Sequence, residues 1–176
     1  MTDYRRYRVQ GGCYFFTLTL YDRRQHLLVE HIEQLRRSIR AVKDKHPFHI
    51  DAMVVLPEHL HCILTLPEGD ANFSMRWRQI KSGFSRQLPV VDIRSKSRER
   101  KQERGIWQRR FWEHVIRDEQ DFCHHVDYIY FNPVKHGWVD KVADWKYSTF
   151  HRDVERGIYL EDWGSGYIEQ VDDMGE

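Results

Sequence analysis

Two apolar runs near the middle of the chain are separated by only two residues, Pro57 and Glu58. The runs are 48–56 (FHIDAMVVL) and 59–66 (HLHCILTL). A parallel crossover needs about a dozen residues or more, so this connection predicts an antiparallel hairpin or, as the alternative, one kinked strand. We favour the hairpin, which makes an antiparallel sheet the starting point for the fold.

The segments around this hairpin show alternating strand and helix patterns. Residues 13–20 (CYFFTLTL) are aromatic and β-branched and predict a strand, as does the alternation over 107–117. Apolar residues spaced three and four apart predict amphipathic helices over 30–45 and 72–88, the second with a basic outer side.

A further helix is expected over 119–132, with Asp118 as its N-cap. The predicted order is therefore βαββαβ followed by one helix. This is typical of an α+β fold with a ferredoxin-like or RRM-like antiparallel sheet, helices on one face and an additional C-terminal helix that carries the catalytic residue proposed below.

Composition predicts one domain. A chain of 176 residues that is 40% hydrophobic and 14% aromatic is unlike a disordered polypeptide. We expect a domain over 1–152, with a basic N-terminal arm (1–12) and a basic loop (about 89–106) that is mobile. An acidic C-terminal tail, 153–176, is expected to follow it.

Three widely spaced cysteines, Cys13, Cys62 and Cys123, are odd in number and predict free thiols in a reducing compartment. No apolar run approaches the roughly 20 residues that a membrane span needs. We therefore expect a cytoplasmic protein with no membrane partner.

Positive charge is concentrated in one part of the chain. Residues 76–110 hold twelve Lys and Arg against three acidic residues, although the net charge of the whole chain is only +1. Such a stretch attracts a polyanion such as nucleic acid, and a solvated basic loop is the alternative interpretation.

His59 and His61 stand two residues apart in a predicted strand, so both imidazoles point to the same face and can chelate one divalent ion. Ordinary surface or core histidines remain an alternative. A metallo-β-lactamase pattern is disfavoured because Ile63 stands where its Asp is required. A structural zinc site lacks a second clean pair of ligands.

In the predicted helix over 119–132, Tyr128 and Asn132 are one turn apart on the polar side, whereas Tyr130 falls nearly opposite among packing residues. Tyr128 is therefore the better candidate nucleophile. A phenol with a pKa near 10 needs a nearby cation or base to react, and an ion held by the histidines would supply it.

Two motifs combine these residues: P-E-H-L-H-C-I-L at 57–64 and D-Y-I-Y-F-N-P-V-K-H-G at 127–137. W-R-Q-I-K at 77–81 and F-W-E-H at 111–114 extend the pattern. Together they resemble the REP-associated tyrosine transposases, single-tyrosine HUH nucleases of the IS200-like type.

The resemblance implies that His59 and His61 bind Mg²⁺ or Mn²⁺, that Asn132 completes the metal shell and that Tyr128 is catalytic. It also implies an endonuclease that cleaves and rejoins single-stranded DNA at repetitive extragenic palindromic (REP) hairpins through a 5′-phosphotyrosine. No nucleotide cofactor is needed, and a monomer is preferred.

Basic and aromatic side chains are the candidates for DNA contact, through phosphates or stacked bases. They are Arg5, Arg6, Tyr7, Arg8, Arg76, Trp77, Arg78, Lys81, Arg86, Arg109, Arg110, Trp112 and Lys135. A non-catalytic single-strand binder on an RRM-like sheet is the alternative from another class, and a hydrolase of small phosphoesters is a third reading.

Overall fold

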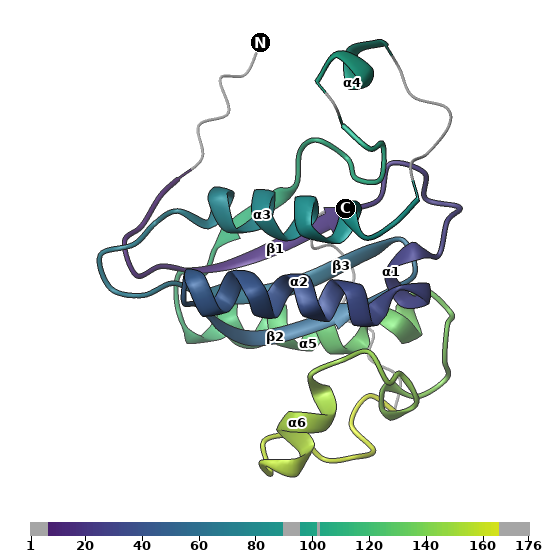
Figure 1. Ribbon diagram of the computed structural model, residues 1–176. Coiled ribbons are helices and arrows are strands. Elements are labelled where there is room, and N and C mark those ends of the chain that lie inside the picture. Colours follow the sequence, from purple (N-terminus) through teal and green to yellow (C-terminus); the bar gives the residue numbers. More distant parts are fainter. Residues whose placement is uncertain (1–6, 90–95, 102, 166–176) are drawn as a thin grey trace, which may run out of the picture.

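A four-stranded antiparallel sheet forms the centre of the computed structural model, which describes residues 7–89, 96–101 and 103–165 (Figure 1). The strands lie in the order β2-β3-β1-β4. Their bounds are β1 Cys13–Thr19, β2 His49–Val55, β3 His59–Thr65 and β4 Trp112–Val115. This order and the antiparallel pairing confirm the ferredoxin-like prediction.

The predicted hairpin is confirmed by the pairing of β2 with β3. Val55 lies opposite Leu60 and Val54 opposite His61. The amide of Leu56 donates to the carbonyl of His59 at 2.9 Å, which closes the connection through Pro57 and Glu58.

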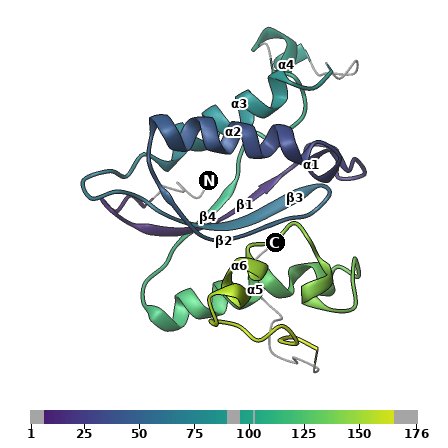
Figure 2. The ribbon, with the colours of Figure 1, turned by 60° about the horizontal axis from the view of Figure 1, so that its bottom comes forward.

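Three helices cover one face of the sheet: α1 (Leu27–Glu30), α2 (Ile32–Lys45) and α3 (Phe73–Arg86) (Figure 2). The predicted apolar stripes of α2 and α3 point toward the sheet and form one core with alternate residues of β1, such as Phe16 and Leu18. The helix predicted over 30–45 is divided, because His31 separates α1 from α2.

The opposite face is covered by α5 (Glu119–Lys135), the 3₁₀ helix η1 (Val142–Asp144) and α6 (Phe150–Glu155) (Figure 2). A second core lies there, where Val126 and Ile129 of α5 pack with Phe15 and Ile63 of the sheet. The additional C-terminal helix of the prediction therefore closes the face that α2 and α3 leave open.

Helix α5 begins as predicted but ends later. The Asp118 side chain accepts from the amide of Asp121 at 2.9 Å, which confirms the N-cap. Pro133 lies inside the helix, which continues to Lys135 instead of ending at residue 132. Two backbone bonds around Gly137, whose φ is +70°, then close the C-terminus in a Schellman arrangement.

Two other boundaries differ from the prediction. The strand expected over 107–117 is reduced to β4, and only an isolated bridge joins Trp107 to Leu20. The basic loop expected over about 89–106 contains a short helix that the sequence pattern did not predict, α4 (Lys96–Arg100).

The expected start of a separate tail at residue 153 is wrong. Asp153 lies inside α6, is buried, and accepts a hydrogen bond from the hydroxyl of Tyr130 on α5. Tyr159 also reaches α5, where its hydroxyl donates to Asp127 at 2.6 Å. The domain therefore continues at least to residue 165, and residues 166–176 of the predicted tail lie outside the described part of the chain.

The cysteines are free thiols, as predicted. Among the described residues, no helix is long and apolar enough to cross a membrane.

Candidate active site

His59 and His61 lie next to each other on the face of β3 that α5 covers. Their ring centroids are 4.8 Å apart, and both side chains are almost fully buried, with 2% and 1% of the residue exposed. In each ring Nδ1 is occupied: Glu58 lies 3.0 Å from Nδ1 of His59, and the Thr17 hydroxyl lies 2.8 Å from Nδ1 of His61. Both Nε2 atoms have no hydrogen-bond partner within the described chain. This leaves two imidazole nitrogens available to one ion.

Burial and nearby charge keep His61 neutral, which is the form in which an imidazole binds a metal. Burial, followed by the nearby His59, His136 and Lys135, holds the pKa of His61 well below its ordinary value. Burial also raises the pKa of Glu58, but the hydrogen bond from His59 and the charges around it lower that pKa more. His61 is therefore neutral, and Glu58, the partner of His59, is ionised.

Tyr128 of α5 lies directly over His61. Their ring centroids are 5.2 Å apart, and only 1% of Tyr128 is exposed. The ammonium of Lys135 lies 5.2 Å from the centre of the same ring. This contact places a positive charge against the ring of the candidate nucleophile.

Asn132 is completely buried one turn after Tyr128, and neither atom of its amide has a hydrogen-bond partner in the described chain. Leaving a buried polar group unpaired costs about 1–3 kcal/mol. A metal bound by the amide oxygen, or a substrate atom that accepted a hydrogen bond from the amide nitrogen, would reduce this cost. The donor set of two imidazoles and one amide therefore fits a divalent cation.

His136 is a member of the site that sequence reasoning missed. Its ring lies 5.1 Å from that of His59, at the C-cap of α5. It follows Asn132 by one helical turn, so the same spacing would have found it if the predicted helix had continued past Pro133.

Two histidines on a strand and a tyrosine on the covering helix form a site that can be compared with known proteins. The family model described as "Transposase IS200 like" matches residues 9–129, a range that contains both histidines and Tyr128. The chain belongs to the IS200-like transposases.

Relatives support this membership over nearly the whole chain. The transposase is 54% identical over 163 residues to the REP-associated tyrosine transposase of Escherichia coli K12, which covers 93% of this chain and 91% of that protein. It is 48% identical over 165 residues to a putative REP-associated tyrosine transposase of Haemophilus influenzae, covering 93% and 94%.

A solved structure of a REP-associated tyrosine transposase bound to a REP hairpin matches this transposase with a TM-score of 0.81. The two are 49% identical, and the match covers 100% of each chain. The resemblance inferred from the motifs at 57–64 and 127–137 is therefore confirmed.

Two of the predicted DNA contacts are wrong, because Arg76 and Trp77 are each only 1% exposed. Trp77 belongs to the core beneath α3. The guanidinium of Arg76 donates to the carbonyls of His46, Pro47 and Asn72 and pairs with Asp70 at 2.7 Å. Both residues build the transposase fold and have no surface to offer to DNA.

Replacing Arg76 with alanine is expected to lower the free energy of unfolding by about 3 kcal/mol or more, because three carbonyls and Asp70 lose their buried partner. Urea denaturation measures the difference. Arg78→Ala, an exposed arginine on the same helix, is the matched control and should change stability by less than about 0.5 kcal/mol. Equal effects of the two substitutions would show that Arg76 is not a structural residue.

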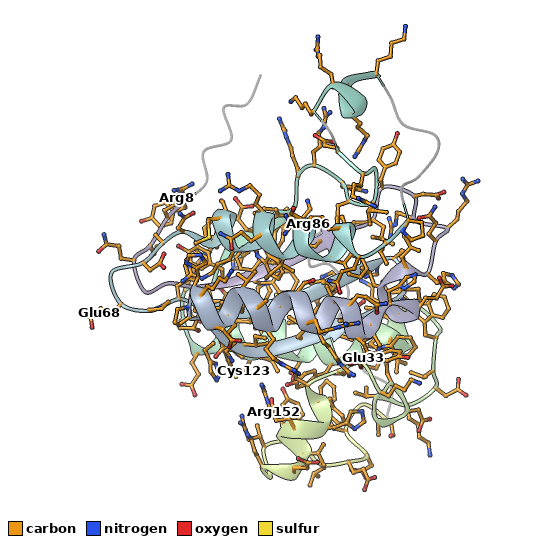
Figure 3. All side chains as sticks on the ribbon, in the orientation of Figure 1. Arg8, Glu33, Glu68, Arg86, Cys123 and Arg152 are labelled. Atoms are coloured by element: carbon orange, nitrogen blue, oxygen red, sulfur yellow. The ribbon has the colours of Figure 1, made fainter. Side chains whose placement is uncertain are left out.

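The basic residues of α3 are separated from the histidines by the sheet. Arg78 and Arg86 line a groove of about 520 Å³ with Arg37 and Lys45 of α2. Figure 3 labels Arg86 on α3 and Cys123 on α5, the helix that covers the opposite face of the sheet. The candidate site lies on the opposite face of the sheet, which α5 covers. A DNA strand can therefore reach both these cations and the candidate site only by extending around the transposase.

The other predicted DNA contacts are in several environments. Lys81 donates to the carbonyl of Gln108 at 2.6 Å, and Arg109 pairs with Glu103 at 3.0 Å, so both hold the loop before β4. Arg5 and Arg6 lie outside the described residues. The remaining candidates are exposed, and they are Tyr7, Arg8, Arg110, Trp112 and Lys135.

Proposed function

We propose that this chain cleaves and rejoins single-stranded DNA at REP-like hairpins, using Tyr128 as nucleophile and a divalent cation held by His59 and His61. The observation that carries the proposal is the pair of adjacent buried imidazoles, whose Nε2 atoms have no hydrogen-bond partner within the described chain, together with the ring of Tyr128 against His61. The hairpin substrate is inferred from the relative whose structure contains a bound REP hairpin.

In the proposed reaction the Tyr128 hydroxyl loses its proton and its oxygen attacks the scissile phosphorus. A phosphotyrosyl bond forms at the 5′ end as the bond from phosphorus to the 3′ oxygen breaks, and the 3′ oxygen takes up one proton and leaves as a hydroxyl. The ester formed is similar in energy to the ester broken, so a 3′-OH can reverse the step without a nucleotide cofactor. Cleavage and rejoining then use one site.

Mg²⁺ or Mn²⁺ fits the site as a cofactor, with His59, His61 and the Asn132 amide as protein ligands. When bound, such an ion withdraws charge from the phosphate oxygens. Glu58 and Thr17 orient the two imidazoles through Nδ1, and the ammonium of Lys135 faces the Tyr128 ring, where it stabilises negative charge.

Trp112 is placed to hold a base of the bound strand. In the sheet register His61 lies opposite Thr17 of β1, and Thr17 lies opposite Trp112 of β4. Trp112 and His61 are therefore separated by two strand spacings, roughly 10 Å. This distance equals the length of about three stacked nucleotides. The indole is 42% exposed. It therefore provides a stacking surface on the catalytic face.

Trp112→Ala is expected to weaken binding of a single-stranded hairpin by about 1–3 kcal/mol, the value of one base stacked on an aromatic ring. Fluorescence anisotropy with labelled DNA measures the change. Leu160→Ala removes a large exposed side chain after α6 and serves as the control with unchanged affinity. A Trp112 variant that binds as tightly as the parent would contradict the stacking role.

The function is tested by incubating the protein with end-labelled hairpin DNA and Mn²⁺ and separating the products on a denaturing gel. A labelled band that migrates with the protein supports the proposal. Binding without any cleavage would instead favour the non-catalytic single-strand binder. Cleaved products without a protein-linked band would favour a hydrolase.

A further inference from the structure

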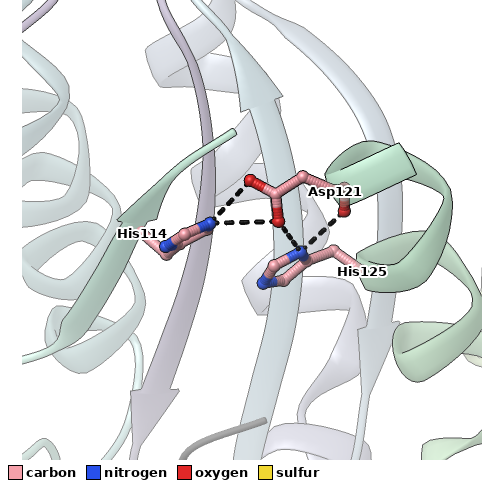
Figure 4. Close-up of side chains that lie close together, drawn as sticks. All are labelled: His114, Asp121 and His125. Carbon is pink, nitrogen blue, oxygen red and sulfur yellow. Dashed lines mark hydrogen bonds and ion pairs between the residues drawn. The ribbon is translucent and has the colours of Figure 1, made fainter. Parts of the chain in front are cut away.

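A second group of metal-ligand side chains lies on the same face of the sheet as the catalytic histidines. It contains His114 of β4 and Asp121 and His125 of α5 (Figure 4). One ligand atom from each residue lies within 4.8 Å of the others. From these residues we propose a second cation site, which takes a transition metal such as Zn²⁺.

The distances within the cluster suit one small ion. Nε2 of His114 is 2.8 Å from one carboxylate oxygen of Asp121, and Nδ1 of His125 is 3.0 Å from the other. Ligands of a tetrahedral zinc with bonds of about 2.1 Å lie roughly 3.4 Å apart. The carboxylate therefore has to move by only a fraction of an ångström from each ring for the ion to enter.

The ligand types indicate which ion is preferred. Two imidazoles and one carboxylate form a set that favours Zn²⁺ or Co²⁺ over Mg²⁺, which prefers oxygen ligands and water. His125 is almost completely buried, but about a fifth of each of the other two side chains is exposed. An ion can therefore enter from solvent and keep a water in its remaining position.

This site is separate from the catalytic pair. The ring of Phe15 stands between them, 4.7 Å from the ring of His125 and 5.5 Å from that of His61. Two-metal catalysis requires ions about 3.5–4 Å apart, and the Phe15 ring prevents such an approach. The second ion therefore has a structural role, in joining edge strand β4 to the start of the helix that carries Tyr128.

Without an ion, protons occupy the same positions. The Asp121 carboxylate then accepts from His114 and from the amide of Arg117, whereas Nδ1 of His125 donates to the backbone carbonyl of Asp121 at 2.8 Å. Metal and protons compete for these imidazole nitrogens, so affinity for the metal increases with pH. A hydrogen-bonded cluster that never binds metal is the rival that the experiment must exclude.

The test measures Zn²⁺ binding by isothermal titration calorimetry in the full chain that carries His59→Ala and His61→Ala. Removing the catalytic ligands makes the count specific to the second site and independent of DNA cleavage. One equivalent of Zn²⁺ is expected to remain bound. No binding at Zn²⁺ concentrations of tens of micromolar would overturn the proposal.

Adding His114→Ala to this protein should weaken Zn²⁺ binding at least about 100-fold. His124→Ala, an exposed histidine on the same helix, is the matched control and should leave binding unchanged. Asp121→Asn retains the side-chain shape and gives a second measurement if His114→Ala does not fold, as judged by circular dichroism. Unchanged affinity in the folded variants would assign the Zn²⁺ to another part of the chain.

Discussion

Tyr128→Phe should reduce the protein-linked DNA band below about one-thousandth of the wild-type yield, because the substitution removes the only atom of this side chain that can attack phosphorus. The phenylalanine ring still packs against Phe15 and His61, whose centroids lie 5.9 and 5.2 Å from that of Tyr128. Because the packing of the ring is retained, hairpin binding should remain within about threefold of wild type. A denaturing gel measures the first quantity and anisotropy the second.

Tyr130→Phe is the matched control, since it makes the same change two residues along the same helix. It removes the hydrogen bond to Asp153 and costs stability, about 1–3 kcal/mol. Cleavage by the folded protein should persist, because Tyr130 faces α6 and not the histidines. An adduct that survived Tyr128→Phe and disappeared with Tyr130→Phe would reverse the assignment.

His61→Ala is expected to decrease the cleavage rate at least about 100-fold and to lower Mn²⁺ affinity by a similar factor. The substitution removes one of the two imidazole nitrogens of the site that are unpaired within the described chain, and it leaves the hydroxyl of Thr17 without its 2.8 Å partner. Calorimetry with Mn²⁺ and single-turnover cleavage at saturating Mn²⁺ measure the two effects separately.

Chelation provides the second test of this metal role. Treating the wild-type protein with EDTA should stop cleavage, and added Mn²⁺ should restore it. His49→Ala is the control, because it removes an imidazole that is 60% exposed on the neighbouring strand. It should change neither the cleavage rate nor the affinity for Mn²⁺. Cleavage at the wild-type rate in EDTA would exclude a catalytic cation and leave Lys135 as the source of positive charge.

The sheet and the side-by-side position of the two histidines could be predicted because both depend on short-range spacing. Two residues between 48–56 and 59–66 permit little except a hairpin, and a period of two places His59 and His61 on the same face. Helical phase then separated Tyr128 from Tyr130, and the structure places their side chains in different environments, beside His61 and beside Asp153.

Other features depend on contacts that spacing does not encode. Arg76 stands at the edge of a predicted apolar stripe, and its partners are backbone carbonyls of the α2–β2 connection, 29 and 30 residues earlier. Nothing in the local pattern indicates a buried guanidinium there. The role of Thr17 depends similarly on the β1–β3 register, which pairs it with His61.

His136 was missed for a different reason. Proline removes a backbone donor and usually ends a helix, so the predicted helix stopped before Pro133. The structure continues α5 for another turn, where Pro133 is buried and the amide of His136 donates to the carbonyl of Asn132 at 3.0 Å. Packing outweighs the local preference and brings a third imidazole near His59.

The burial of Tyr130 against α6 limits how many DNA ends one polypeptide can hold. Burial and the hydrogen bond to Asp153 both raise the pKa of Tyr130. Tyr130 therefore cannot serve as a second phenolate beside Tyr128. On the proposed chemistry each polypeptide captures a single 5′ end at a time. Excising a segment with two ends therefore requires either two polypeptides acting together or two successive turnovers by one.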